Sequence, residues 1–279
     1  MCFSAPSAHD HVGVEISPPM MRQSLRVLPH AACLALSSWL STGTTAAQVI
    51  PQGFVYLRDI APDIVQDMKY AGPDNFTGSK VPGYNAGECI LLRAVAEALR
   101  KVQAELREQT LGLKVYDCYR PARATKAFLL WIHKVSTPTT TKRFFPKINR
   151  RSLHSLGYVS SSSAHSRGIA VDLTLVWVPP PAQQEFDPRA NYASCTGHAT
   201  DRSPDNSIDM GSGFDCFDPM SHTESLMVTR EQQDRRRLLR NLMKRHGFQG
   251  YDREWWHFTF GAGRRSGGAL DFPVERRPG

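Results

Sequence analysis

Two short segments of the chain carry imidazole and carboxylate groups at spacings that suit a metal site. In the first segment, His165 and Asp172 lie seven residues apart, and Gly168 permits a turn between them. Asp172 falls within an apolar run, where burying a carboxylate without a partner is costly. A metal ion would neutralise that charge, and imidazole and carboxylate groups are common zinc ligands. For this pair alone, a hydrogen-bonded His–Asp pair in a loop is the alternative interpretation.

The second segment, Glu254-Trp255-Trp256-His257, offers a third ligand and a carboxylate three residues before it. Three protein ligands leave one coordination position for water, which is the arrangement of catalytic zinc sites. Zinc lowers the pKa of water towards neutrality, and Glu254 is the candidate base that accepts the proton. Residues three apart on a regular strand face opposite sides, so Glu254 must precede the strand or the backbone must bulge there. The alternative is a core strand with a hydrogen-bonded histidine.

The third segment runs from Tyr116 to Pro121 and contains Arg120 at a predicted strand-to-helix junction. A guanidinium group at such a position could polarise a scissile carbonyl and stabilise the developing oxyanion. A structural salt bridge is the alternative interpretation of this arginine.

Together these segments resemble the D-alanyl-D-alanine dipeptidases of the VanX type, within the zinc D-Ala-D-Ala metallopeptidase family. The family pattern S-x-H-x-x-G-x-A-x-D matches residues 163–172, E-x-W-H matches 254–257, and Y-R-P matches 119–121. Further matches fall in 70–78, 83–84 and 210–215. Each motif is weak alone, but their common order and spacing over about 54–273 form a specific signal.

The resemblance implies a role for each matching residue. His165, Asp172 and His257 would bind one zinc ion per chain. Glu254 would act as general base and later as acid, and Arg120 would stabilise the tetrahedral intermediate. The implied pocket is small and closed and accepts a free dipeptide. The matching substrate-binding positions are Ser163 at the substrate carboxylate, Asp215 near its amino end, and Tyr70, Tyr84 and Phe128, although Phe128 also fits the buried face of a helix.

The elements that must position these residues indicate an α+β fold. Apolar periodicity and punctuation by Gly and Pro predict helices over 90–108, 121–134 and 229–246, strands over 113–116, 169–178 and 255–260, and short strands and loops over 49–85. Thr229 and Gln232 fit a capping box, and Gly247 fits the end of that helix. No regular βαβ units occur, so we expect a single domain with a small mixed or antiparallel sheet packed by helices. The resemblance implies a hedgehog/DD-peptidase-like fold.

A polar, proline-rich stretch at about 178–208 departs from the short members of the family. It is longer than loops in compact domains usually are without a function or a covalent tie. We interpret it as an insertion that precedes the 210–215 motif and could reshape the rim of the pocket. It therefore leaves strict specificity for dipeptides open.

The N-terminal residues 1–47 resemble a leader followed by a secretory signal peptide. Arg22 and Arg26 supply positive charge, an apolar run covers 31–40, and small residues at 45–47 offer a cleavage site. Met20 or Met21 is an alternative start, and a disordered tail is the other interpretation of this region. A lipoprotein signal ending at Cys33 is disfavoured by His30. We expect an exported bacterial protein, periplasmic or secreted, whose peptidase domain covers 48–279.

Removal of 1–47 would leave four cysteines, and an even number in an exported protein suggests disulfides. Three pairings are possible. We favour Cys89–Cys118 and Cys195–Cys216, because the second pair brackets the insertion. A cysteine zinc site is disfavoured, since no two cysteines have C-x-x-C spacing.

The chain is basic, with a formal charge of +8 and a pI of about 9.3. Its densest basic cluster, Arg235, Arg236, Arg237 and Arg240, is expected to be a solvated helix face. No nucleic-acid-binding signature accompanies it, so nucleic acid is not an expected partner. The apolar run at 31–40 is too short to span a bilayer, so stable membrane insertion is not expected. The expected partner is a small dipeptide substrate, and the oligomeric state is left open.

Three functions compete on these observations. The leading hypothesis is zinc-dependent hydrolysis of D-alanyl-D-alanine to two D-alanines in the turnover of cell-wall dipeptides. The alternative enzyme is a zinc D,D-carboxypeptidase or endopeptidase that acts on peptidoglycan stem peptides. A binding or signalling module of a related zinc fold is a third possibility, but it does not need both Glu254 and Arg120, which are present here.

Overall fold

A computed structural model describes residues 50–136, 138–261 and 267–278. These residues belong to one compact unit, which spans Ala46–Gly279. The expected leader and signal peptide at 1–47, with Cys2 and Cys33, lie outside the described residues. Within the described part of the chain, no helix is long and apolar enough to cross a membrane.

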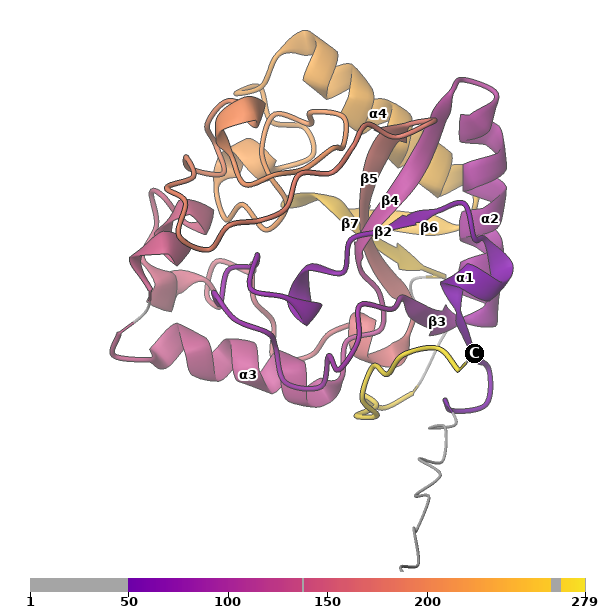
Figure 1. The fold of residues 1–279 in the computed structure, drawn as a ribbon, viewed down its shortest axis with the longest axis horizontal. Coiled ribbons are helices and arrows are strands. Elements are labelled where there is room, and N and C mark those ends of the chain that lie inside the picture. Colours follow the sequence, from indigo (N-terminus) through magenta and orange to yellow (C-terminus); the bar gives the residue numbers. More distant parts are fainter. Residues whose placement is uncertain (1–49, 137, 262–266, 279) are drawn as a thin grey trace, which may run out of the picture. The chain divides into compact units, whose positions relative to one another are not determined.

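A five-stranded mixed sheet forms the centre of this unit (Figure 1). Its strands, in spatial order, are β2 (Val65–Gln66), β4 (Leu111–Asp117), β5 (Ala170–Trp177), β7 (Glu254–Phe260) and β6 (Phe248–Tyr251). Strands β2 and β4 are parallel, and the other neighbours are antiparallel. A separate antiparallel pair consists of β1 (Phe54–Tyr56) and β3 (Ile90–Leu92). The expected α+β class and mixed sheet are confirmed.

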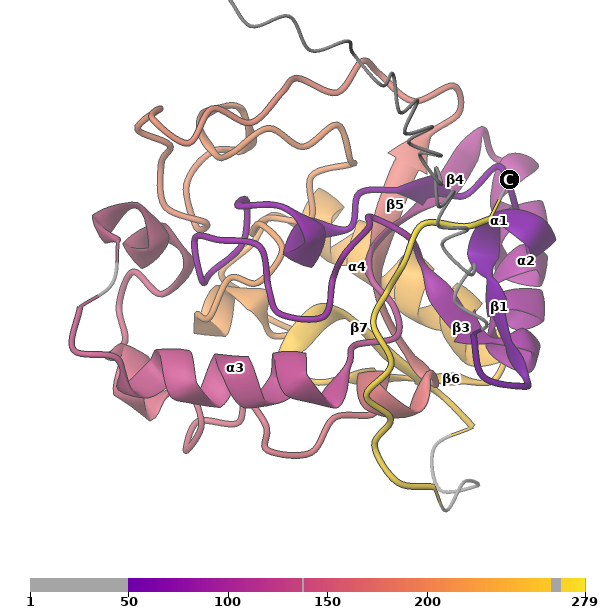
Figure 2. The same cartoon turned by 60° about the horizontal axis from the view of Figure 1, so that its bottom comes forward.

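Helices cover this sheet unequally. The α-helices are α1 (Leu57–Ile60), α2 (Arg93–Arg107), α3 (Ala122–His133) and α4 (Arg230–Arg245). Helices α2 and α4 lie on one face of the sheet, and α3 and the long loops lie on the other (Figures 1 and 2). Short 3-10 helices occupy Lys69–Ala71, Thr139–Phe144, Arg150–Ser152, His165–Arg167, Ala199–Asp201 and Pro219–Ser221.

The helix expected over 90–108 begins three residues later, at Arg93. Residues Ile90–Leu92 instead form β3, because their backbone groups pair with β1, with Tyr56 opposite Ile90 and Phe54 opposite Leu92. The predicted apolar stripe is confirmed beyond that point. Its buried members are Val95, Leu99, Val102 and Leu106.

Helix α4 has the expected ends. The Thr229 side chain accepts a hydrogen bond from the Gln232 amide, and the Gln232 side chain accepts one from the Thr229 amide. Gly247 follows the helix with a φ of 88°, in the left-handed region that glycine adopts at little cost. Both the capping box and the C-terminal stop are confirmed.

The expected solvated arginine face on α4 is wrong for one residue. Arg237 is exposed, but Arg236 is only 1% exposed. Its Nε donates to the carbonyl oxygen of Met210, and its Nη1 donates to those of Met220 and His222. These three carbonyl groups compensate for burial of the guanidinium group, which here ties α4 to the loops that precede it.

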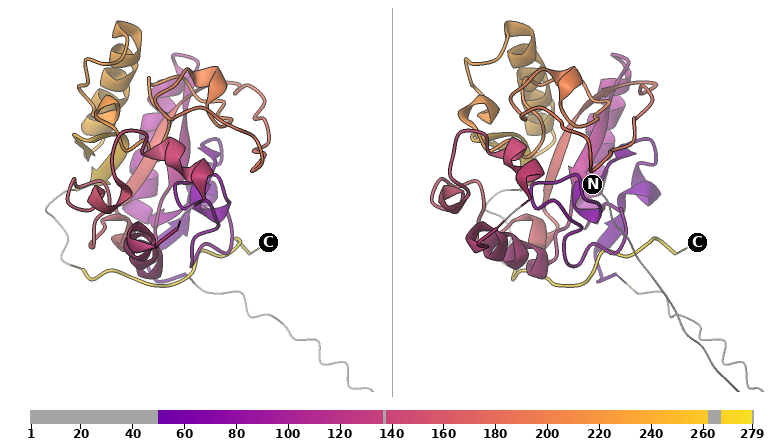
Figure 3. Two further views of the ribbon diagram at one scale, coloured as in Figure 1. Left: turned by 90° about the vertical axis from the view of Figure 1, so that its left-hand side faces the viewer. Right: turned by 60° about the vertical axis from the view of Figure 1, so that its left-hand side comes forward.

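Both favoured disulfides are present, Cys89–Cys118 and Cys195–Cys216. The second joins Cys195 of the insertion to Cys216, which lies 21 residues further along the chain and directly follows the 210–215 motif. Apart from the 3-10 turn Ala199–Asp201, the insertion has no regular secondary structure. Figure 3 shows this orange loop segment beside β4 and β5.

Candidate active site

Three side chains from distant parts of the sequence converge at one point. His257 Nδ1 lies 2.9 Å from Asp172 Oδ1 and 3.1 Å from His165 Nε2. His165 Nε2 lies 3.3 Å from Asp172 Oδ1. His165 and Asp172 are almost fully buried, with exposed fractions of 1% and 2%. The predicted ligand residues therefore share one site with the geometry of a metal centre.

Local backbone geometry explains this convergence. Asp172 and His257 are directly opposite each other in the antiparallel pair of β5 and β7, so their side chains project from the same face of the sheet. His165 lies in a short 3-10 turn that Gly168 ends with a φ of 68°. A Cβ atom at Gly168 would also lie 2.2 Å from the ring of Phe54. Glycine is therefore required at the turn that brings His165 to the sheet.

The second nitrogen of each imidazole ring orients the histidine towards the shared point. His165 Nδ1 donates to the carbonyl oxygen of Cys118 at 2.7 Å. Because a carbonyl group can only accept, the proton resides on Nδ1 and the lone pair on Nε2 points at Asp172. On the other ring, Thr259 Oγ1 lies 3.3 Å from His257 Nε2 and leaves Nδ1 for the shared point.

The donor set fits a tetrahedral metal ion. Ligand atoms about 2.0–2.1 Å from a tetrahedral zinc ion lie about 3.3 Å from one another. The three observed separations, 2.9, 3.1 and 3.3 Å, are close to that value. Two imidazole nitrogens and one carboxylate oxygen are also the ligand types that zinc binds in hydrolases. His165, Asp172 and His257 are thus the residues that could hold a metal ion.

The charge of the two histidines acts on Asp172. Burial alone would raise the pKa of Asp172, but the adjacent His165 and His257 outweigh burial and lower it below its ordinary value. Burial lowers the pKa of His257 and so favours the neutral ring, which is the form that binds metals. The lowered pKa of Asp172 favours its anionic form and the lowered pKa of His257 favours its neutral form, and these are the forms that bind a metal ion.

Glu254 faces the same cavity from the first position of β7. The register between β6 and β7 shifts between Gly250 and Tyr251, so the backbone is irregular opposite 255–257. This irregularity is the expected bulge, and it lets Glu254 and His257 line one cavity although they are three residues apart. Burial, together with the negative charges of Asp172 and Asp215, raises the pKa of Glu254 well above its ordinary value. A carboxylate with a raised pKa is a stronger base than a free one, which suits it to accept a proton.

Arg120 is held by the carboxylate of Asp117, which lies in the Tyr116–Pro121 segment but was not predicted to be a functional residue. Asp117 Oδ2 accepts from Arg120 Nε at 2.9 Å and lies 2.8 Å from Nη2. Asp117 Oδ2 also lies 3.4 Å from His165 Nδ1. Burial opposes the charge on Arg120, but Asp117, Tyr70, Tyr84 and Asp172 together outweigh it and raise the pKa of the guanidinium group. Asp117 ends a buried strand three residues before Arg120, and that spacing was the signal available in the sequence.

The cavity that joins these groups has a volume of about 390 Å³. Four of the five predicted substrate-binding residues line it: Ser163, Tyr70, Asp215 and Phe128. Tyr70 donates to Asp215 Oδ2 at 2.8 Å, and the Arg120 guanidinium group lies over the rings of Tyr70 and Phe128. Burial and the charge of Asp172 raise the pKa of Asp215 well above its ordinary value. A cationic group bound there would therefore be stabilised by a carboxylate that has few other charge partners.

Tyr84, the fifth predicted residue, is not among the cavity-lining residues. It is fully buried and donates to Asp117 Oδ1 at 2.5 Å, while Arg120 Nε donates to Oδ2 of the same carboxylate. Tyr84 therefore supports the Asp117–Arg120 pair and does not contact the cavity. The motif match at 83–84 correctly placed Tyr84 near the site, but its side chain points to Asp117 and not into the cavity.

One wall of the cavity was not predicted from the sequence, and the loop at 154–162 forms it. Tyr251, from the hairpin that leads to Glu254, donates to the carbonyl oxygen of Gly157 at 3.0 Å. Tyr158 in the same loop lies 3.1 Å from His222 Nε2 through its hydroxyl oxygen. This serine-rich loop has no apolar periodicity, so nothing in its pattern distinguished it from an ordinary surface loop.

Comparison with known proteins agrees with this geometry. The sequence matches the peptidase M15 family, described as D-ala-D-ala dipeptidase, over residues 51–178 and 191–274. The unmatched residues between these stretches fall within the expected insertion.

Similar proteins occur in several bacteria. A D-alanyl-D-alanine dipeptidase of Enterococcus faecium is 34% identical over 80% of this chain and 98% of its own length. One of Streptomyces coelicolor is 35% identical over 79% of this chain and 98% of its own length, and one of Escherichia coli is 31% identical over 73% and 82%. This extent of agreement establishes that the chain is a peptidase of the M15 family of D-Ala-D-Ala dipeptidases.

Proposed function

We propose that this protein is a zinc dipeptidase that hydrolyses D-alanyl-D-alanine to two molecules of D-alanine. The observation that carries the proposal is the convergence of His165, Asp172 and His257 beside Glu254 in one cavity. The names of the similar proteins supply the substrate, and the family match supplies metal-dependent peptide hydrolysis.

The chain's own residues divide the reaction between them. His165, Asp172 and His257 would hold the zinc ion, which lowers the pKa of water and polarises a carbonyl group. Glu254 accepts a proton from the attacking water and later passes it to the leaving amine, so that water and one peptide bond give a carboxylate and an amine. The raised pKa of Glu254 suits both transfers.

Arg120 and Asp215 address the charges of the substrate. The guanidinium group of Arg120, fixed by Asp117, stabilises negative charge that develops on the carbonyl oxygen. Asp215, with Tyr70, binds the free ammonium group of the dipeptide. Ser163, which lies two residues before His165 and lines the same cavity, hydrogen-bonds the substrate carboxylate. A longer peptide that ends in D-Ala-D-Ala keeps the terminal carboxylate but has no ammonium group at this position, so the contact with Asp215 favours the free dipeptide.

We also propose that the protein is exported and acts on dipeptides released from the cell wall. Two disulfides, Cys89–Cys118 and Cys195–Cys216, support an oxidising compartment, and the leader-like sequence of residues 1–47 agrees with export. N-terminal sequencing of the mature protein, isolated from separated cell fractions, tests this part. A mature protein that retains residues 1–47 in the cytoplasm would contradict it.

The experiment that tests the activity compares free D-alanyl-D-alanine with its N-acetylated form and with a peptidoglycan stem peptide. The proposal predicts zinc-dependent release of D-alanine from the free dipeptide and little from the others. Release only from the acylated or longer peptides would replace the dipeptidase by a D,D-carboxypeptidase or endopeptidase. The same protein treated with a chelator is the control.

A further inference from the structure

The insertion at 178–208 is attached to the central sheet by a buried lysine. Lys114 of β4 is 1% exposed, and its ammonium group lies 2.9 Å from Asp205 Oδ1, 3.0 Å from Gln183 Oε1 and 3.0 Å from Asn206 Oδ1. All three oxygen atoms belong to the insertion. A buried ammonium group needs such partners, so these contacts attach the insertion at a defined position on the sheet.

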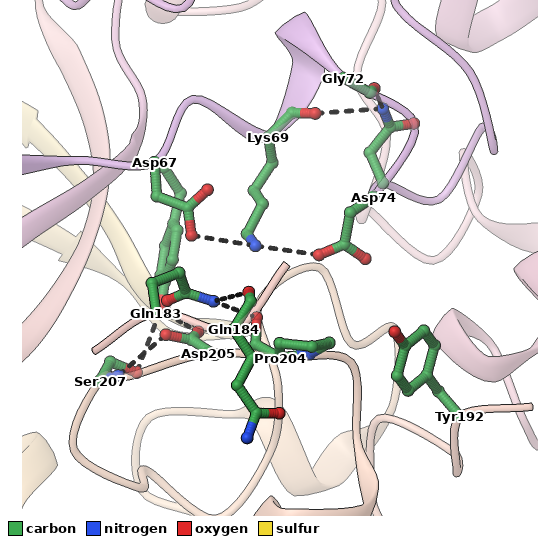
Figure 4. Close-up of polar contacts among 12 residues, drawn as sticks. Asp67, Lys69, Gly72, Asp74, Gln183, Gln184, Tyr192, Pro204, Asp205 and Ser207 are labelled. Carbon is green, nitrogen blue, oxygen red and sulfur yellow. Dashed lines mark hydrogen bonds and ion pairs between the residues drawn. The ribbon is translucent and has the colours of Figure 1, made fainter. Parts of the chain in front are cut away.

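A second group of ion pairs, centred on Lys69, lies next to the Lys114 attachment site. Figure 4 shows Lys69 between Asp67 and Asp74, with Asp205 and Ser207 of the insertion nearby. Asp67 Oδ2 lies 2.9 Å from Lys114 Nζ and 3.0 Å from Lys69 Nζ. Lys69 directly precedes the cavity residue Tyr70. The contacts that attach the insertion to the sheet therefore belong to the same polar cluster as the residue next to the cavity wall.

Asp205 also reaches the cavity wall through an aromatic stack. Its Oδ2 accepts a hydrogen bond from the Tyr116 hydroxyl at 2.5 Å. The Tyr116 ring is stacked on Phe214, with centroids 4.7 Å apart and an interplanar angle of 23°. Phe214 directly precedes Asp215, whose carboxylate faces the cavity. A single carboxylate of the insertion thus fixes the ring against which the neighbour of Asp215 packs.

Asp215 needs such support, because its backbone is in an uncommon conformation. Its φ is 56°, in the left-handed region that residues other than glycine seldom adopt. Such a conformation persists only where the surrounding structure holds it. The Cys195–Cys216 disulfide lies at the next residue, and the Gly213 amide donates to the Cys195 carbonyl oxygen at 2.9 Å. The insertion therefore holds Asp215 from both sides.

We propose that Asp205 is a positioning residue for the ammonium subsite of the substrate, acting through Tyr116 and Phe214 on Asp215. This inference rests on the proposed dipeptidase function, because it assigns the ammonium group of the dipeptide to Asp215. The insertion then contributes to substrate selection without contacting the substrate. It makes the position of one carboxylate depend on a part of the chain outside the metal centre.

The test uses the holoenzyme and two ligands that differ at one group. D-alanyl-D-alanine is the substrate, and D-lactoyl-D-alanine, in which a hydroxyl replaces the ammonium group, is added as a competing ligand whose inhibition constant, Ki, is measured against the dipeptide. For Asp205→Asn, we expect KM for the dipeptide to rise about fivefold, within the range of coupling through packed side chains. The kcat value and the Ki of the lactoyl compound should stay within about twofold, because the weakened contact to the ammonium group is equally strong in the ground state and the transition state.

Two further variants make the test decisive. Tyr116→Phe keeps the stack on Phe214 but removes the hydroxyl group, so it should raise KM in the same way, and it decides the question if Asp205→Asn does not fold. Asp187→Asn is the matched control, because the carboxylate of Asp187 pairs with the exposed Arg189 within the insertion. Unchanged KM in the two test variants, or an equal rise in KM and Ki, would overturn the inference. Absence of dipeptide hydrolysis by the unaltered protein would instead refute the proposed function.

Discussion

Asp172 and His257 face each other across neighbouring strands β5 and β7, with Oδ1 and Nδ1 2.9 Å apart. The sheet register alone brings these two groups together, although they are 85 residues apart in sequence. His165 completes the set from a glycine-ended turn. Because two of the three proposed ligands lie on paired strands, the fold preorganises the site, an arrangement that favours tight metal binding.

Loss of one ligand should abolish stable metal binding. In His257→Ala the remaining two ligands cannot complete a tetrahedral site, so we expect zinc affinity to fall by more than about a hundredfold, beyond the effect typical of residues that only support ligands. Isothermal titration of the metal-free protein measures this change. His198→Ala is the control, because His198 is exposed and caps a turn in the insertion. Unaltered zinc affinity in His257→Ala would remove His257 from the ligand set.

Glu254→Gln should separate metal binding from catalysis. The amide has nearly the shape of the carboxylate but cannot accept the proton, so kcat should fall by about 10²–10⁴-fold. Zinc content, measured by atomic absorption, should equal that of the unaltered protein, since Glu254 is not one of the three ligands. A variant with normal turnover would show that another group is the base.

Arg120→Lys tests the planar pairing with Asp117. A lysine keeps the positive charge but cannot make both contacts that Nε and Nη2 make with Asp117 Oδ2. We expect kcat to fall by about 10²–10³-fold, as for loss of one oxyanion donor, with a smaller change in KM. Steady-state kinetics measures both values. A variant that changes KM alone would indicate that Arg120 binds the substrate equally in the ground state and the transition state.

The Cys195–Cys216 disulfide should stabilise the folded protein. It closes a loop across 21 residues of sequence separation, for which the chain-entropy relation gives about 3 kcal/mol. The double variant Cys195→Ser/Cys216→Ser should lower the free energy of unfolding by about this amount in urea titrations under oxidising conditions. The unaltered protein under reducing conditions is a poor comparison, because Cys89–Cys118 would also open. Equal stability of the variant and the unaltered protein would show that the insertion is held by its ion pairs alone.

Asp205 should make stability depend on acid pH. Lys114 and Lys69 outweigh burial and lower the pKa of Asp205 from 3.8 to about 2. A folded-state pKa below the unfolded one stabilises the protein above pH 4, and this contribution is lost as the pH falls towards 2. At 1.36 kcal/mol per pKa unit, its full size is about 2.5 kcal/mol.

The measurement for Asp205 is a difference between two proteins. The stability of the unaltered protein minus that of Asp205→Asn should be largest above pH 4 and should approach its minimum near pH 2. Unfolding in urea at pH values between 2 and 6 gives this difference while cancelling most other titrating groups. A difference that does not vary with pH would contradict the ion pair with Lys114.

The sequence predicted which three side chains converge, because their motifs lie on strongly patterned elements. Asp172 and His257 fall on apolar strands, and Gly168 marks the turn that carries His165. The ends of α4 were also predictable, since the capping box of Thr229 and Gln232 acts locally. Local chemistry and periodicity thus determined where these groups are and which elements carry them.

Other features depend on contacts between distant segments, which no local pattern encodes. Arg236 is buried because carbonyl groups of Met210, Met220 and His222 fold around it. The ammonium group of Lys114 is compensated by residues about 70–90 positions later. Tyr84 turns towards Asp117 and not the cavity for the same kind of reason. In each case tertiary hydrogen bonds override the expectation drawn from residue type.

The account depends most directly on one zinc ion held by His165, Asp172 and His257 beside Glu254. Zinc titration of the metal-free protein, with D-alanine release from D-alanyl-D-alanine as the readout, tests this claim. We predict that the rate rises in proportion to added zinc and stops rising at about one equivalent per chain, the single-site stoichiometry of catalytic zinc. Full D-alanine release by protein from which a chelator has removed the metal would contradict it.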